Sequence, residues 1–80
     1  MRVEVRLFAT LARHRPSTLA GSPFDVTLEE TATLTDLVIR LGIPHAKIHL
    51  AMVDGRIVLD ADLALSDGCR VGLFPPVGGG

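Results

Sequence analysis

Apolar and charged residues alternate at the start of the chain. The apolar positions are Val3, Val5 and Leu7, and the charged positions between them are Arg2, Glu4 and Arg6. This period of two predicts a half-buried strand over residues 2–9. Residues 24–28 alternate again and predict a second strand. The stretch 10–23 is rich in proline and glycine, so we expect a long loop with one helical turn near Leu11.

A helix is predicted over residues 34–41. Thr33 is a good N-cap, and Asp36 stands at the third helical position, where it completes a pair resembling a capping box. The spacing i, i+3, i+4, i+7 places one apolar stripe on the helix, formed by Leu34, Leu37, Val38 and Leu41. Gly42 supplies a left-handed C-terminal cap, and Pro44 prevents the helix from continuing. This amphipathic helix is expected to cover one face of a sheet.

Three further strands are predicted after the helix, over residues 48–53, 56–59 and 70–74. Asp54-Gly55 is typical of a type I′ hairpin turn between the first two of them. Pro75-Pro76 ends the last strand, because proline cannot donate to a ladder. Two strands, one helix and three strands predict an α+β domain of two layers, with one main helix packed across a mixed sheet of about five strands.

Composition narrows the function. Eighty residues allow one domain, and 48% hydrophobic residues exclude a disordered chain. The chain has eight basic and nine acidic residues, and its three aromatic residues are all Phe. Proteins that bind nucleic acids typically have a basic stripe with aromatic residues between the charges, so we expect no nucleic-acid partner. No apolar run approaches the ~20 residues of a membrane span, and we expect no membrane partner. With a single cysteine, Cys69, and no apolar leader, a cytoplasmic location is the expectation.

The last six residues differ from everything before them. The chain closes with Pro75-Pro76-Val77 and then Gly78, Gly79 and Gly80. Glycine has no side chain to pack, so we expect residues 1–74 to form the globular domain and residues 75–80 a flexible tail. A slim peptide with an unhindered carboxylate suits a protein whose own C-terminus reacts, whereas an incidental flexible end is the alternative.

The chain resembles a known family in its opening Val5–Ala9, its hairpin Val53–Arg56 and above all its closing run. That run is Leu65-Ser66-Asp67-Gly68, followed by Val71-Gly72-Leu73-Phe74-Pro75-Pro76-Val77-Gly78-Gly79-Gly80. It looks like the ubiquitin-like sulfur carriers of the MoaD/ThiS group, which include the small subunit of molybdopterin synthase. The resemblance implies a β-grasp fold, which agrees with the predicted order of elements.

The resemblance also implies the chemistry of the tail. A ubiquitin-activating-like adenylyltransferase would use ATP to adenylate Gly80, and a sulfur donor such as a cysteine desulfurase or rhodanese would convert it to a thiocarboxylate. Gly79 and Gly78 would complete the tail motif, and Phe74, Leu73, Pro75, Pro76 and Val77 are candidate docking residues for partners. For Phe74, a plain core position is the alternative. The implied acceptor is a molybdopterin synthase large subunit or another sulfur acceptor enzyme. The carrier itself would contribute no catalytic residue, no metal and no bound cofactor.

Other residues with chemical potential carry weaker predictions. His45 and His49 are four apart, but Pro44 and the strand pattern remove the helix that would align them on a metal, so we expect an exposed His49. Cys69 is expected to be a structural thiol. Three functions remain open at this point: sulfur carriage for molybdopterin, thiamine or another metabolite, conjugation of Gly80 to lysines as a ubiquitin-like modifier, and a β-grasp binding module whose tail is irrelevant.

Overall fold

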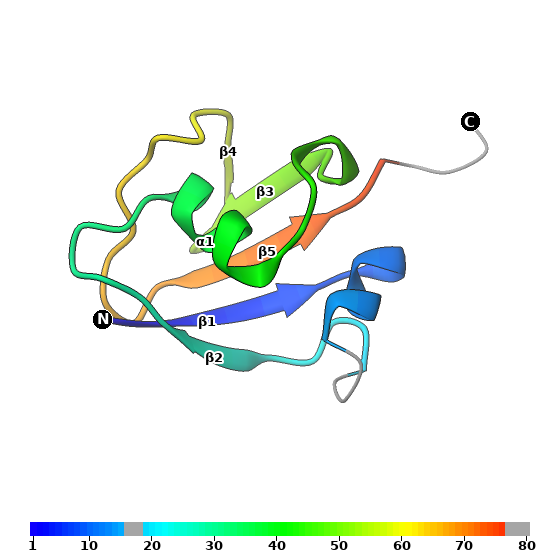
Figure 1. Cartoon of the computed structure of the whole chain (residues 1–80), viewed down its shortest axis with the longest axis horizontal. Helices are drawn as coiled ribbons and strands as arrows, with labels where there is room; N and C mark the ends of the chain where they lie inside the picture. Colours follow the sequence, from blue (N-terminus) through cyan, green and yellow to red (C-terminus); the bar gives the residue numbers. More distant parts are fainter. Residues whose placement is uncertain (16–18, 77–80) are drawn as a thin grey trace.

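The computed structural model describes residues 1–15 and 19–76 of the chain. Within them, five strands form one mixed sheet in the order β2-β1-β5-β3-β4 (Figure 1). The strands are β1 (Arg2–Leu7), β2 (Phe24–Thr27), β3 (Leu50–Val53), β4 (Arg56–Val58) and β5 (Arg70–Phe74). The predicted fold class and the predicted position of the last strand are therefore confirmed.

The pairing directions determine what lies at each end of the sheet. β1 and β5 are parallel, with Val5 opposite Val71 and Leu7 opposite Leu73. β2 pairs antiparallel with β1, and β3 pairs antiparallel with β5. The end of β1, the end of β5 and the beginning of β3 therefore lie at the same end of the sheet. Pro75 and Pro76, the first two residues of the predicted tail, follow β5 at this end.

The α-helix α1 (Leu34–Leu41) lies across one face of the sheet (Figure 1). Its start is the predicted capping box: the Thr33 hydroxyl accepts a bond from the Asp36 N–H at 3.2 Å, and the Asp36 carboxylate accepts from the Thr33 N–H at 2.9 Å. Its end is Gly42, whose φ of 72° is the left-handed conformation that glycine adopts without strain. Both predicted ends of the helix are confirmed.

The core lies between α1 and the sheet. It is formed by the inward positions of the strands and the apolar stripe of the helix, which include Val3, Val5, Leu7, Val26, Leu34, Leu37, Val38, Ala51, Val71 and Leu73. The 3-10 helix η1 (Ala9–His14) contributes Leu11, which is 2% exposed and closes the tail end of the core. This is the helical turn predicted near Leu11.

The structure corrects the predicted bounds of four strands. The first ends at Leu7 instead of residue 9, the second at Thr27 instead of residue 28, and the fourth at Val58 instead of residue 59. The third strand begins at Leu50 instead of residue 48, because residues His45–Lys47 form a second 3-10 helix, η2, that the sequence analysis missed. Its turn is closed by bonds from the Lys47 N–H to the Pro44 carbonyl at 2.9 Å and from the Ile48 N–H to the His45 carbonyl at 3.1 Å. The predicted hairpin turn is confirmed, with φ of 51° at Asp54 and 82° at Gly55. None of the described helices has the length and apolarity to cross a membrane.

Candidate functional site

The tail root, by which we mean Phe74, Pro75 and Pro76, follows directly from the central strand of the sheet. β5 lies between β1 and β3, and its last two carbonyls are bonded on opposite sides. The Phe8 N–H donates to the Leu73 carbonyl at 3.1 Å, and the His49 N–H donates to the Phe74 carbonyl at 2.8 Å. Pro75 and Pro76 follow at once, and neither can donate to a neighbouring strand. The direction in which the chain leaves the domain is therefore fixed by two strands up to Phe74.

Two phenylalanine rings lie beside this root, on the sheet face opposite α1. Phe8 follows β1 and Phe74 ends β5, and their rings stack with centroids 4.3 Å apart and planes inclined by 2°. Both residues are half-buried. Gly72 makes room for the pair, because a Cβ there would lie 3.3 Å from the Phe8 ring and 3.5 Å from the Phe74 ring. The pair therefore forms a flat aromatic surface at the point where the tail starts.

The aromatic pair continues into a small apolar patch across the open sheet face. The register places Gly72 opposite Met52 and Met52 opposite Ile57, so Met52 and Ile57 share that face. Ile57 is 60% exposed. A hollow of about 150 Å³ lies among Phe8, Met52, Gly72 and Phe74. We call Phe8, Phe74, Met52 and Ile57 the open-face patch. It is apolar surface that the fold leaves uncovered next to the tail.

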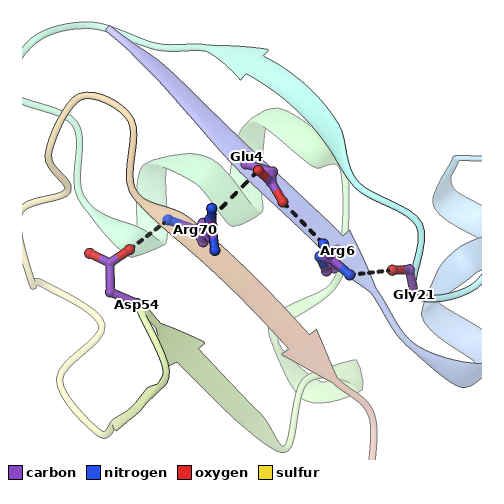
Figure 2. A network of polar contacts seen from close by, with 5 residues as sticks. All are labelled: Glu4, Arg6, Gly21, Asp54 and Arg70. Carbon is purple, nitrogen blue, oxygen red and sulfur yellow. Dashed lines mark hydrogen bonds and ion pairs between the residues drawn. The ribbon is translucent and has the colours of Figure 1, made fainter.

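The other half of the open face is polar. Glu4 lies between Arg6, at 3.4 Å, and Arg70, at 3.8 Å, as Figure 2 shows. The Arg6 guanidinium also donates to the Gly21 carbonyl at 3.3 Å, and the Arg70 N–H donates to the Asp54 carboxylate at 2.9 Å. Exposed pairs of this kind contribute at most about 1 kcal/mol each. Their main effect is to place a polar border along one side of the open-face patch.

The predicted docking residues differ in their exposure to solvent. Val77, Gly78, Gly79 and Gly80 lie outside the described residues. Phe74 is half-buried on the open face, Pro75 is half-buried and Pro76 is exposed, so all three are accessible to a partner. The prediction for Leu73 was wrong. Its side chain is 0% exposed, because alternation along β5 turns Leu73 into the core when Phe74 faces outward.

The cysteine and the histidines add no chemistry to this site. Cys69 is 4% exposed, and burial raises the pKa of its thiol above the ordinary value of 9.0. A thiol that stays protonated is a poor nucleophile, which fits the predicted structural role. His45 and His49 are both exposed. His45 is the first residue of η2, and His49 lies between η2 and β3, so it precedes the strand in which it was predicted. Within residues 1–15 and 19–76, no three potential metal-ligating side chains cluster together.

Sequence reasoning missed Phe8 as a site residue. The signal was present, because Phe8 follows Arg2, Glu4 and Arg6 on the polar side of the period-two pattern. A large aromatic residue on a face otherwise occupied by charged residues indicates a contact or a docking surface. Its partner Phe74 is 66 residues away, so only the parallel pairing of β1 with β5 brings the two rings together.

Comparisons with known proteins agree with this arrangement. A family model described as the ThiS family matches residues 5–80. No curated protein matches the chain. The solved structure of the HVO 2177 protein from Haloferax volcanii is 29% identical, with a TM-score of 0.78, over 100% of this chain and 87% of that one.

Two other solved structures are similar over almost the whole chain. One is named molybdopterin converting factor, subunit 1, from Pyrococcus furiosus. It is 26% identical to this chain, with a TM-score of 0.72, and the match covers 96% of this chain and 99% of that one. The other is small archaeal modifier protein 1 from H. volcanii, with 23% identity and a TM-score of 0.73, over 95% and 98% of the two chains. The two share one fold with this chain, although one is named as a subunit and the other as a modifier.

Proposed function

The chain belongs to the ThiS family, and from this premise we propose that it is a sulfur carrier. Members of this family are small ubiquitin-like β-grasp carriers that are not catalysts themselves, as the sequence resemblance implied. In the proposed reaction, Gly80 is adenylated by a ubiquitin-activating-like enzyme and converted to a thiocarboxylate. The thiocarboxylate then donates its sulfur in cofactor biosynthesis, and molybdopterin is the product we favour.

The geometry of the tail root is the observation that carries this proposal. β5 is held on both sides up to Phe74, and six residues then remain to the C-terminus. Six extended residues reach at most about 20 Å, enough to enter a buried active site while the domain stays outside. Two prolines at the root restrict the chain to extended forms, which lowers the entropy lost on insertion. Glycines at the end allow close approach to a nucleotide, since they have no Cβ.

The chemistry requires activation because a free carboxylate does not react with nucleophiles at neutral pH. ATP converts the Gly80 carboxylate to an acyl-adenylate and releases pyrophosphate. A sulfur nucleophile then attacks the carbonyl carbon, so that a C–S bond forms and the C–O bond to AMP breaks. Where the donor is a persulfide, a thiol attacks the donor sulfur of the remaining S–S bond, so that a new disulfide forms and the thiocarboxylate is released. This chain supplies the carbonyl, whereas the partners supply ATP, the acid–base groups and the sulfur.

We propose that the open-face patch is the docking surface for these partners. It is apolar, it adjoins the tail root, and a partner seated on it would receive the tail in a fixed direction. The partners we expect are the adenylyltransferase, a sulfur donor such as a cysteine desulfurase or rhodanese, and a molybdopterin synthase large subunit. The name of the P. furiosus protein, subunit 1 of a converting factor, supports a partner subunit of this kind.

Mass spectrometry tests the proposed function directly. The purified protein is incubated with ATP, the host's ubiquitin-activating-like adenylyltransferase and a sulfur donor. We expect the intact mass to show one oxygen replaced by sulfur, and fragmentation to place the change on Gly80. Adding the loaded protein to the host's molybdopterin synthase large subunit should discharge the sulfur. An unchanged mass with every activating enzyme of the host would contradict sulfur carriage.

Truncating the aromatic pair should weaken partner binding without unfolding the domain. We expect Phe74→Ala and Phe8→Ala each to cost about 2 kcal/mol of binding to the adenylyltransferase, or about 30-fold in Kd, because aromatic anchors dominate interfaces. Isothermal titration calorimetry measures the loss. Ile39→Ala is the matched control, since Ile39 is 70% exposed on α1, on the other layer. Equal affinities for the control and the Phe variants would show that partners bind elsewhere.

Protein conjugation is the second candidate function. We retain this alternative because the chain shares its fold with a protein named as a small archaeal modifier. A lysine amine would then attack the carbonyl carbon of the same adenylated Gly80, so that an isopeptide bond forms and AMP is released. A blot for the tagged protein in host cells distinguishes the two functions. A ladder of conjugates that disappears when Gly79 and Gly80 are deleted indicates modification, and a single free band indicates carriage alone.

A further inference from the structure

The charges of this chain are segregated along the sequence although its net charge is only −1. Three stretches, residues 5–24, 37–53 and 68–80, contain no Asp or Glu. They hold six of the eight basic residues, namely Arg6, Arg13, Arg15, Arg40, Lys47 and Arg70, and all three histidines. The nine acidic residues occupy the intervening segments. Such blocks have a spatial consequence only where the fold brings them together.

The topology brings η1 and η2, which lie in two of these stretches, to the tail end of the sheet. η1 follows the end of β1, and η2 precedes the beginning of β3. Their flanking residues Phe8 and His49 bond to the last two carbonyls of β5 from opposite sides. The tail root therefore emerges between η1 and η2, as the course of the chain shows (Figure 1).

At this end, basic side chains of η1 and η2 surround one hollow. It has a volume of about 310 Å³, and Arg13, His14 and Lys47 line it with Thr10, Leu11 and Pro44. Arg13 and Lys47 are exposed. Among the described residues, the ion pairs are those of the N-terminal amine with Glu30, of Arg6 with Glu4 and of Arg70 with Glu4, so these two cations take part in none. We call Arg13, His14 and Lys47 the basic collar.

Acidic groups are held at the opposite end, where β1 and β5 begin. The Asp67 carboxylate accepts from the Arg2 N–H at 2.8 Å, and the Asp54 carboxylate accepts from the Arg70 N–H at 2.9 Å. Glu30 lies 3.2 Å from the N-terminal amine. The domain therefore has a basic end, where β5 stops and the tail begins, and a carboxylate-rich end, where β1 and β5 begin.

We infer that the basic collar recognises an acidic protein surface, namely the carboxylate-lined rim of the channel in the activating enzyme that receives the tail. This inference rests on the proposed function. A charge-separated molecule turns in the field of a negative rim so that its tail points at the opening before contact. Electrostatic steering of this kind raises association rates by about 10–10³-fold. A carboxylate of the rim then pairs with Arg13 and Lys47, which line the same hollow.

A nucleic acid is a poorer match for the collar. Non-specific binding of nucleic acids needs many phosphate contacts, and single strands also need aromatic platforms. The collar has two permanently charged side chains, and the rings of Phe8 and Phe74 are stacked on each other on the open face. Protein carboxylates, which a few cations can pair, are the partner chemistry that this surface favours.

The test compares two double charge reversals in the full-length protein. R13E/K47E reverses the collar, and R40E/R56E makes the same change in net charge at exposed positions outside it. Association with the host adenylyltransferase is followed by stopped-flow at low ionic strength and at about 1 M salt, where the Debye length is about 3 Å. We expect the collar variant to associate at least about 10-fold more slowly at low salt. In high salt it should match wild type, and its Gly80 adenylation at saturating enzyme should stay normal.

The outcomes separate this inference from the proposed function. If the wild type is never adenylated, the proposed function fails whatever the collar does. If the wild type is adenylated but the collar variant associates as fast as R40E/R56E, the collar inference is overturned. Binding of a host transfer-RNA pool that the collar variant alone loses, with unchanged association to the enzyme, would also overturn it. Circular dichroism confirms that both variants fold.

Discussion

Deletion of Gly79 and Gly80 is expected to abolish thiocarboxylate formation while the free energy of unfolding stays unchanged. The shortened chain still ends on a glycine, Gly78, but its carboxylate is withdrawn by about 7 Å along an extended tail. Misplacing a reacting group by only about 1 Å can cost about 100-fold in rate. The loss should therefore be complete within detection, although the nucleophile, the nucleotide and the docking surface are all intact. Intact-mass analysis after incubation with ATP, adenylyltransferase and sulfur donor measures it.

The control for this deletion is stability, measured by urea denaturation. Glycine has no side chain to bury, so removing two of them should leave the midpoint where it is in the full-length protein. A shortened chain that is as stable as wild type and cannot be loaded supports a reacting C-terminus. Full biological activity of the same variant would instead support a β-grasp binding module whose tail is irrelevant.

The largest expected effect on stability comes from Leu73→Ala. Leu73 is 0% exposed and lies on β5, the central strand, opposite Leu7 and Ala51. Truncating a buried leucine removes its transfer free energy and leaves a cavity, at a typical cost of about 3–5 kcal/mol. A domain of this size has a small total stability, so the variant should be largely unfolded at moderate urea concentrations. The chain has no Trp or Tyr, and far-ultraviolet circular dichroism is therefore the suitable probe.

Leu59→Ala is the matched control, because Leu59 is 93% exposed. The same chemical change there should alter the free energy of unfolding by no more than about 0.5 kcal/mol. The contrast tests the assignment of faces along β5, on which Leu73 packs inward and its neighbour Phe74 lies on the open face. If the two variants were equally stable, the core and the open face would have been assigned to the wrong sides.

The elements that the sequence predicted correctly are those specified within a few residues. The capping box of Thr33 and Asp36, the left-handed cap at Gly42 and the Asp54-Gly55 turn each depend on contacts within one turn of chain. The bounds of β5 follow from alternation and a double proline. The errors came where local signals compete: η2 replaced the start of the predicted third strand, since Pro44 and the residues after it close a 3-10 turn.

By itself, the sequence determined the class of the fold, the helix with its caps and the last strand, because spacing and turn chemistry express these locally. The tertiary structure alone decided that Phe8 stacks on Phe74 and that basic residues of η1 and η2 line one hollow at the tail end of the sheet. It also turned Leu73 inward. The physical reason is the parallel pairing of β1 with β5, which joins opposite ends of the chain and which no local pattern encodes.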